Sequence, residues 1–398
     1  MSTRTSADDT PPHGLPVTVV EGPQRMRVTR ARARARTSRP TVSGAVFDSR
    51  GRRRSRLTRR AWLLVCALAA LLLAVGVFVW YEVEADPSGT PGRPVLIDIR
   101  SGESTGSVLA QLTAEGVIGS SLAYELWMLL HARPTILPGH YLVHRNLSFA
   151  ALTSVLEAGP NVFDLGVQPG LTLSEIASQL SHLPGDLANP FLQAARHGAV
   201  RSPFQPAAGA TLEGLVGDGT YRIFPGETAR QLLTQMVERF DAQAKAAGLT
   251  PSTTVGGLDA YQIVTLASIA QKEGYYDRYL GDVARVIYNR LGAGTALDMT
   301  STVLYALGID GGSPTPAEEQ TTSPYNTYLH TGLTPTPICV PSERALAAAV
   351  SPPPGTWLYF ELVTPKKGVM VFSSTFSSQL AAENEAALNA AARQSGSG

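Results

Sequence analysis

An uninterrupted apolar run near the start is the feature that most limits how this chain can fold. Residues 61–81, AWLLVCALAALLLAVGVFVWY, contain no charged side chain in 21 positions. As an α-helix at about 1.5 Å per residue, this run is about 31 Å long, enough to cross a hydrocarbon layer of about 30 Å. Trp62 lies near one end and Trp80 with Tyr81 at the other, where interfacial aromatic residues are enriched. The run therefore predicts a transmembrane helix over residues 61–81.

Charge is divided between the two sides of this run. Residues 1–60 hold 15 arginines, no lysine and four acids, a net charge of +11, whereas the rest of the chain holds 18 bases and 28 acids. The positive-inside rule places residues 1–60 in the cytoplasm, as a basic and disordered tail, and the chain after Glu82 outside it. A single-pass protein of the cell membrane is therefore expected.

Two alternatives bear on this N-terminal region. A cleaved signal peptide would use residues 83–85 as its cleavage site, but the 60-residue leader and the long apolar stretch favour an uncleaved anchor. Residues 25–39 are rich enough in arginine for a nucleic-acid patch, yet they lack aromatic residues and a recognisable binding fold. We expect a solvated segment that touches anionic lipid, and no nucleic-acid partner.

A linker over residues 82–94 precedes a segment with the order strand, helix, helix, strand. The strands are expected at residues 95–99 and 141–144, and Ser104 is expected to cap the first helix. This order resembles the LysM-type module that binds N-acetylglucosamine polymers, which we place at residues 95–165. Residues 102–106 also match the G-x-S-x-G pattern of a nucleophile elbow. In a faint internal repeat the counterpart of Ser104 is Thr172, as expected of a helix cap and not of a nucleophile.

The cysteines and histidines of the sequence do not indicate a disulfide or a metal site. Cys66 and Cys339 are the two cysteines, one inside the predicted membrane helix and one outside it. None of the seven histidines belongs to an H-E-x-x-H pattern. We therefore expect no disulfide framework, no metal site and no cofactor.

The predicted helix that begins at Ala260 is the most informative segment. Its apolar residues form one arc of a helical wheel, and Glu273 follows Leu266 by seven positions, so it lies on the same arc. Gly274 then predicts the end of the helix. A carboxyl group on the buried side, at the negative end of the helix dipole, should have a raised pKa. A general acid that works near neutral pH needs such a pKa.

Further motifs accompany this helix in a fixed order. They are EGLVGDGTY at 213–221, ASIAQKE at 267–273, YNRL at 288–291, TVLYALG at 302–308 and SPYNTYLHTGLTPTPICVP at 323–341. Over residues 95–385 the chain resembles the endolytic murein transglycosylase family, also called YceG-like, to which an anchor and a LysM-like module also belong. The family signature A-S-I-x-x-K-E ends in its catalytic glutamate. The resemblance therefore implies that Glu273 is the catalytic acid.

The resemblance also sets the expected organisation and function. We expect an α+β chain: a single-pass N-terminal transmembrane helix, the LysM-like module, a mixed α+β catalytic domain at 166–390 and a flexible C-terminus at 391–398. It implies an endolytic lytic transglycosylase that cleaves the MurNAc–GlcNAc bond within nascent peptidoglycan strands, leaves 1,6-anhydro-MurNAc ends and terminates polymerisation. Peptidoglycan strands are the expected partner, with cell-wall synthases of the elongation or division machinery beside them. The candidate substrate-binding residues are Glu213, Asp218, Tyr221, Ser268, Tyr288, Asn289, Arg290, Tyr325, Asn326 and Thr327.

The chain departs from the family pattern at three places, one of which is Gly217, where the family has a proline. Residues 297–300 are LDMT where the family has L-Q-x-D, and Ser378 with Gln379 stands where many members have Glu and His. Two alternatives therefore stay open. One is a non-catalytic glycan-binding membrane protein, and the other is a hydrolase in which Glu213 or Asp298 assists Glu273 as the second carboxylate.

Overall fold

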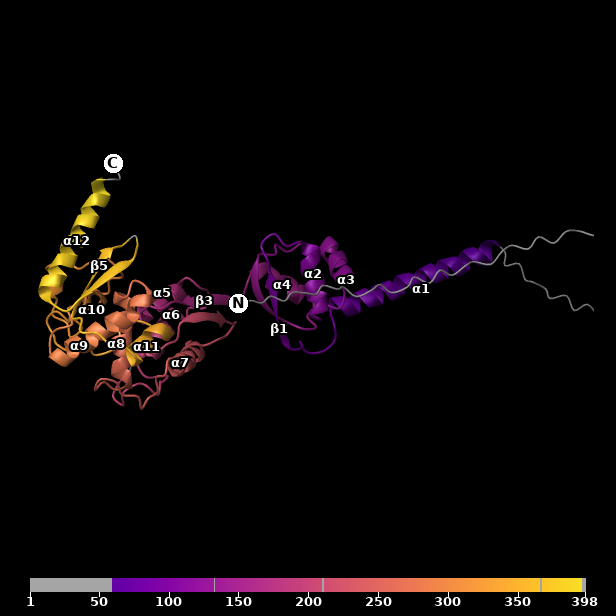
Figure 1. Ribbon diagram of the computed structural model, residues 1–398. Helices are drawn as coiled ribbons and strands as arrows, with labels where there is room; N and C mark the ends of the chain where they lie inside the picture. Colours follow the sequence, from indigo (N-terminus) through magenta and orange to yellow (C-terminus); the bar gives the residue numbers. More distant parts are fainter. Residues whose placement is uncertain (1–58, 132, 210, 366, 396–398) are drawn as a thin grey trace, which may run out of the picture. The chain divides into compact units, whose positions relative to one another are not determined.

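The long apolar run forms one helix. The computed structural model describes residues 59–131, 133–209, 211–365 and 367–395, so the predicted cytoplasmic tail lies outside the described residues up to residue 58. Helix α1 (Arg59–Ala85) is continuous over 27 residues and buries no side chain (Figure 1). Within the described part of the chain it is the one helix long and apolar enough to cross a membrane. It is consistent with a single N-terminal membrane anchor.

A first small core follows α1. It is built from β1 (Pro94–Ile99), α2 (Thr105–Ala114), α3 (Ser121–Leu130), β2 (Gly139–His144) and α4 (Phe149–Ala158). The two strands pair antiparallel, and their buried side chains join those of the three helices in one apolar cluster. The expected order of strand, helix, helix, strand is present, and α4 is a further element that the sequence analysis did not anticipate.

Helix caps in both cores follow the sequence. Ser104 caps α2, because its hydroxyl accepts a hydrogen bond from the Ser107 N–H at 3.2 Å. This contact confirms Ser104 as a cap. Thr172 is a cap as expected, and it forms a capping box with Glu175 at the start of α5 (Leu173–Ser181).

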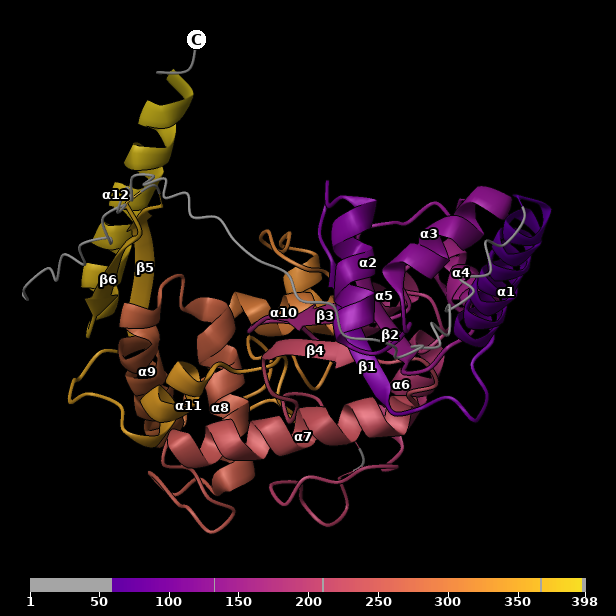
Figure 2. The ribbon, with the colours of Figure 1, turned by 90° about the vertical axis from the view of Figure 1, so that its right-hand side faces the viewer.

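The second core contains most of the remaining chain. Its elements after α5 are α6 (Ala188–Arg196), β4 (Gly219–Ile223), α7 (Ala229–Ala246), α8 (Ala260–Glu273), α9 (Leu280–Ala293), α10 (Thr300–Leu307) and α11 (Glu343–Val350), with short 3₁₀ turns at Asp277–Tyr279 and Glu318–Gln320. β3 (Phe163–Val167) pairs antiparallel with β4, so this strand belongs to the second core and the predicted boundary at 165/166 falls inside it. Helix α8 is at the centre, and α11 packs on α7, α8 and α9 (Figure 2).

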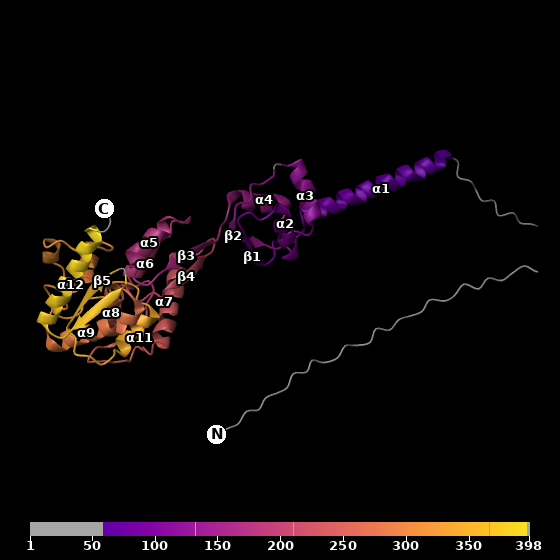
Figure 3. The same cartoon turned by 45° about the horizontal axis from the view of Figure 1, so that its top comes forward.

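A hairpin and a long helix complete the chain. β5 (Tyr359–Thr364) and β6 (Val369–Ser373) pair antiparallel, and α12 (Phe376–Ser395) lies against β5 (Figure 3). Residues 391–395, predicted to belong to a flexible C-terminus, are the last part of this helix. In the described residues the fold is therefore mixed α+β, mostly helical, with three separate two-stranded sheets.

Candidate active site

Helix α8 fixes the position of Glu273. Its N-terminus is held by a reciprocal capping box between Asp259 and Gln262, and its middle, residues 263–270, is buried on every side. Glu273 is the last helical residue, as predicted. Gly274 ends the helix with φ −80° and not in the left-handed conformation that a glycine usually supplies there. It is glycine because a Cβ would lie 2.7 Å from the side chain of Leu280 and 2.9 Å from the carbonyl oxygen of Ala270.

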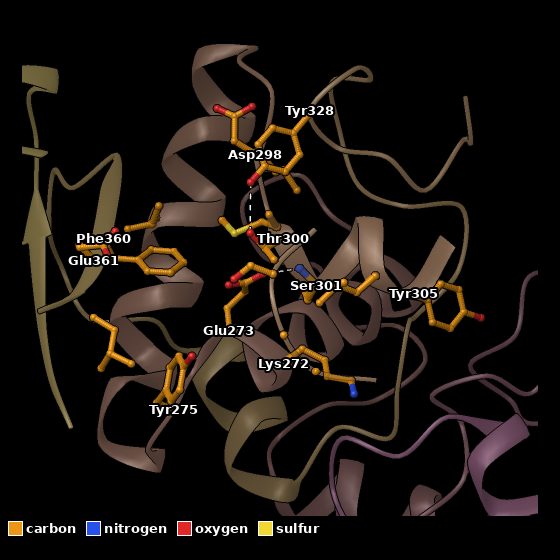
Figure 4. A pocket seen from close by; sticks show the side chains of 18 of the residues that line it. Lys272, Glu273, Tyr275, Asp298, Thr300, Ser301, Tyr305, Tyr328, Phe360 and Glu361 are labelled. Carbon is orange, nitrogen blue, oxygen red and sulfur yellow. Dashed lines mark hydrogen bonds between the residues drawn. The ribbon is translucent and has the colours of Figure 1, made fainter. Parts of the chain in front are cut away.

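Glu273 lines an open cavity of about 960 Å³. The walls come from the start of α5, the end of α8, α9, the loop before α10, α10 and the loop after it, β5, β6 and the first two turns of α12. In Figure 4 the Glu273 carboxylate lies in the middle of this space, with Phe360 and Glu361 on one side and Tyr305 on the other. A cavity of this size is large enough to hold a ligand in contact with the Glu273 carboxyl group.

The Glu273 carboxylate contacts the start of α10. Its Oε1 accepts a hydrogen bond from the backbone N–H of Ser301 at 3.0 Å (Figure 4). The N-cap residue of α10, Met299, supplies no side-chain cap, so Glu273 satisfies one of the free N–H groups at that terminus. Glu273 thus lies between the C-terminus of one helix and the N-terminus of another.

Burial controls the ionisation of Glu273. Loss of solvent raises the pKa of its carboxyl group, and Ser301 opposes the rise through its hydroxyl and its backbone N–H. Burial and Ser301 account for the shift, and no charged side chain among the described residues contributes to it. The raised pKa predicted from the sequence is confirmed in direction. A carboxylic acid that keeps its proton above its ordinary range can act as a general acid.

Arg290 is the second predicted site residue that lines the cavity, but its nitrogens bind the protein. Nε donates to the carbonyl oxygen of Leu358 at 2.6 Å, and Nη1 donates to the carbonyl oxygens of Ala296 and Leu297 at 3.0 Å each. Nη1 also bonds the Asp298 carboxylate at 2.6 Å. Arg290 therefore holds the loop that leads into α10 against the start of β5, and so keeps the Ser301 N–H at Glu273.

The backbone of Asp298 has a conformation that the sequence did not predict. Its φ is +52°, a left-handed backbone that aspartate tolerates better than most side chains. Thr300, two residues further on, lines the cavity, and its hydroxyl is 3.1 Å from that of Tyr328. Because Asp298 is paired with Arg290, its charge is already neutralised inside the site.

The other predicted substrate-binding residues do not line the cavity. Their polar atoms hold neighbouring backbone or side-chain groups: Ser268 the Ile338 N–H, Tyr288 the Ala349 carbonyl, Asn289 the Gly355 and Trp357 carbonyls, Asn326 the Glu319 and Thr321 carbonyls, Thr327 the Met299 N–H, Tyr325 the Thr336 hydroxyl, Tyr221 the Gly217 carbonyl and Asp218 the Gln243 amide. These contacts fix the loops around α8. These residues do not line the cavity, and their role in sugar binding stays a prediction.

Glu213 is buried beneath the cavity wall and not within it. Its Oε1 accepts from the Leu173 N–H at 3.1 Å, and its Oε2 accepts from the Tyr305 hydroxyl at 3.2 Å. Burial raises the pKa of this carboxyl group to about 7, against the lowering effect of both hydrogen bonds. Since Tyr305 lines the cavity and Glu213 does not, Glu213 supports the wall from behind.

Several cavity residues were missed by the sequence analysis. Tyr305 and Tyr328 lie inside the TVLYALG and SPYNTYL motifs, so a signal for them existed. Ser301 acts through its backbone N–H, which no side-chain pattern marks. Glu361 on β5 carried no motif signal, and Gln379 on α12 was marked only as a departure from the family pattern.

The chain is thus a mixed α+β protein with one candidate membrane span among the described residues and a half-buried glutamate at the end of α8 in an open cavity. Comparison with known families gives a more specific result. Residues 97–385 match the model of the YceG-like family, and the chain belongs to that family.

Individual relatives are distant. The chain is 25% identical over 337 residues to an endolytic murein transglycosylase of Streptococcus pneumoniae, a match over 76% of this chain and 61% of that protein. It is 23% identical over 321 residues to an endolytic murein transglycosylase of Bacillus subtilis, over 76% of this chain and 88% of that protein. A crystal structure of a yceG-like protein from Listeria monocytogenes is 24% identical, covers 72% of this chain and 98% of that one, and superposes with a TM-score of 0.45. The chain thus spans about three fifths of the streptococcal relative's length.

Proposed function

We propose that this protein is an endolytic lytic transglycosylase of peptidoglycan, with Glu273 as its catalytic acid. The observation that carries the proposal is the Glu273 carboxyl group, which has a raised pKa and lies in an open cavity. Glu273 is the last residue of the family signature, at the end of α8. Support also comes from the distant relatives named endolytic murein transglycosylase.

One good acid suffices for this reaction. Glu273 protonates the glycosidic oxygen between N-acetylmuramic acid and N-acetylglucosamine, and the bond from that oxygen to the muramic C1 breaks. The muramic 6-hydroxyl of the same sugar then attacks C1, and Glu273 takes its proton, which leaves a 1,6-anhydro end. Because the nucleophile is already part of the substrate, no activated water and no second carboxylate are needed.

The surroundings of the two other candidate carboxylates favour this mechanism over hydrolysis. Asp298 is tied to Arg290, and Glu213 does not line the cavity. Asp298 lines the cavity, but its carboxylate is already held by Arg290. The Ser301 N–H stabilises the carboxylate that forms when Glu273 gives up its proton, and so assists the first step.

The location follows from α1 and the charge distribution. We place residues 1–60 in the cytoplasm and the rest of the chain after α1 outside, where nascent glycan strands are made. The β1–α4 core then acts as a LysM-like glycan-binding module, and cleavage within strands terminates their growth. Cell-wall synthases of the elongation or division machinery are the proposed protein partners.

Substitution of the acid tests the proposal. Glu273→Gln keeps the size and the acceptor for the Ser301 N–H but cannot transfer a proton. Glycan cleavage by the full chain in detergent should fall at least about 10²–10⁴-fold while thermal stability is retained. The matched control is Glu385→Gln on α12, which does not line the cavity and should leave cleavage unchanged. A Glu273→Gln protein of undiminished activity would refute the assignment, and an inactive unmutated protein that still binds glycan would favour a binding module.

A further inference from the structure

Helix α3 of the first core has an exposed side made of leucine. Its members, which we call the leucine face, are Leu122, Leu126, Leu129 and Leu130. Each is between 39% and 69% exposed, and at 3.6 residues per turn all four fall within about 100° of the helix surface. The other side of α3 is buried in the first core through Ala123, Tyr124 and Met128. An exposed apolar stripe of this kind marks a surface that contacts lipid or protein.

The start of α3 lies against the end of α1. Gly119 comes directly before Ser120, the N-cap of α3, and it lies so close to Glu84 that a Cβ at this glycine would clash with the Glu84 carboxylate. Ala85, the last residue of α1, packs on the same apolar cluster as α3. Figures 1 and 3 show α3 beside this end of α1. Contacts therefore hold α3 at the point where the anchor helix ends.

The contact between Gly119 and Glu84 places the start of α3 at the level of the lipid headgroups. The apolar run ends at Tyr81, and Glu84 follows it by three residues, about 4.5 Å along the axis of α1. A headgroup layer is about 5–7 Å thick on each side of the hydrocarbon. The linker from Ala85 to β1 has eight residues, which limits the first core to about 30 Å from the end of α1. The bilayer is therefore the surface nearest to the leucine face.

We infer that the leucine face of α3 inserts into the outer leaflet of the membrane that α1 crosses. This inference rests on the location given under the proposed function, with the first core outside the cytoplasm. A helix at the membrane surface is held there by an apolar face buried about 5–10 Å into the boundary between headgroups and acyl chains. A second copy or another protein covers this face only when it binds, whereas α1 keeps the bilayer within reach at all times. The first core is then held at the membrane, where it reaches glycan close to the bilayer.

A nitroxide label on the full-length protein, in liposomes of phosphatidylethanolamine and phosphatidylglycerol, tests the inference. Leu129→Cys is made in a Cys66→Ala background. Cys339 is buried, and burial raises the pKa of its thiol, so it does not take the label. Collisions of the label at residue 129 with O₂, which concentrates in lipid, should exceed those with a water-soluble nickel chelate. A label at Leu388→Cys on α12, where the leucine is 72% exposed against 69% for Leu129, should show the reverse.

A label within α1 separates this inference from the proposed location. Leu72→Cys, in the middle of the apolar run, reports whether α1 is in lipid. Chelate access at residue 72 would refute the membrane location and the inference together. Lipid at residue 72 with chelate access at residue 129 would refute the inference alone. Spin–spin broadening at residue 129 that disappears on dilution with unlabelled protein would show that a second copy covers the leucine face, and would also overturn the inference.

Charges on the leucine face provide the converse test. Leu122→Glu/Leu126→Glu changes two exposed positions, so the thermal unfolding of the first core should be retained. In this variant the label at residue 129 should become accessible to the nickel chelate, because carboxylates disfavour insertion of the helix into lipid. The matched control is Leu380→Glu on α12, which should leave the label in lipid. A label that stays in lipid in the doubly charged variant would contradict the role of the leucine face.

Discussion

The two cores of this chain differ in what they bury. In the first core the cluster is apolar, and Thr153, bonded to the Tyr124 hydroxyl, is its one buried polar residue among those described. The second core buries a glutamate, an arginine, an asparagine and several hydroxyl groups, and these make specific hydrogen bonds. Buried polar groups add little net stability and are costly when unpaired. These groups lower the net stability of the second core, but their hydrogen bonds fix the loops around α8 in one conformation.

The difference also separates packing from chemistry. Apolar burial in the first core is non-directional and stabilises the module as a unit. In the second core the Arg290 and Glu213 contacts act on particular atoms: Arg290 on the loop before α10, and Glu213 on Tyr305 and the start of α5. Both converge on α10, whose Ser301 N–H bonds Glu273. Matched substitutions in the two cores should therefore differ in their effects on stability and activity.

Loss of Arg290 should have the largest effect. Arg290→Met leaves the Ala296, Leu297 and Leu358 carbonyl oxygens without this donor, at a cost of about 1–3 kcal/mol for each group left buried and unpaired. Activity should fall about 100-fold, because the Ser301 N–H is displaced from Glu273. Chemical unfolding and glycan cleavage measure the two effects.

The control for Arg290 is an arginine of the first core. Arg145 pairs with Glu115 at 3.5 Å on the surface, and both side chains are about half exposed. Arg145→Met should change stability by less than about 1 kcal/mol and leave cleavage of short oligomers unaltered. Equal effects of the two substitutions would break the comparison.

Glu213 should make the second core sensitive to pH. Its folded pKa of about 7 lies above its ordinary value of 4.5, so the folded state holds a proton that the unfolded state has released between these values. Its contribution to stability is complete below pH 4.5 and is lost as the pH rises through 7, a change of up to about 3 kcal/mol at 1.36 kcal/mol per pH unit.

Glu213→Gln should remove that slope. Glutamine resembles the neutral carboxylic acid and can bond both the Leu173 N–H and the Tyr305 hydroxyl. Hydrogen exchange of α8 amides at pH 5 and pH 8 measures the free energy of opening in the second core. Thr153→Val in the first core is the control and should keep the slope of the unmutated protein. A slope that persists in Glu213→Gln would assign the pH dependence to another group.

A smaller shift is expected at the acid itself. Activity requires protonated Glu273, so kcat/KM should fall as the pH rises through its raised pKa. Ser301→Ala removes the hydroxyl that lowers this pKa, and the declining limb should move to higher pH. A pH–rate profile of both proteins measures the shift. Movement to lower pH would contradict the account of the Glu273 environment.

Local chemistry explains what the sequence could predict. The anchor helix, the Ser104 cap, the Thr172–Glu175 capping box and the place of Glu273 at the end of α8 all depend on residues within a few turns of one another. The partners of Glu273 and Arg290 could not be predicted in the same way. Ser301 is 28 residues from Glu273 and Leu358 is 68 residues from Arg290, and both act through backbone atoms.

The contact between Gln379 and Glu361 shows the same limit of prediction from sequence. Gln379 was visible only as a departure from the family pattern, and nothing in the sequence placed it beside Glu361. Its position depends on α12 packing against β5, a contact between elements that the sequence analysis did not define. Residues such as Asn289 and Asn326 illustrate the reverse error, because their motif positions suggested sugar binding whereas their amides hold backbone carbonyls.

The chemical identity of the product tests the central claim most directly. Purified peptidoglycan is digested with the full-length protein, and the new glycan ends are analysed by mass spectrometry. If Glu273 acts alone as acid and then base, every new muramic end is a 1,6-anhydro sugar, one water lighter than a reducing end. The same ends should be absent after treatment with Glu273→Gln. Reducing ends from the unmutated protein would show that water attacks, and would contradict the account.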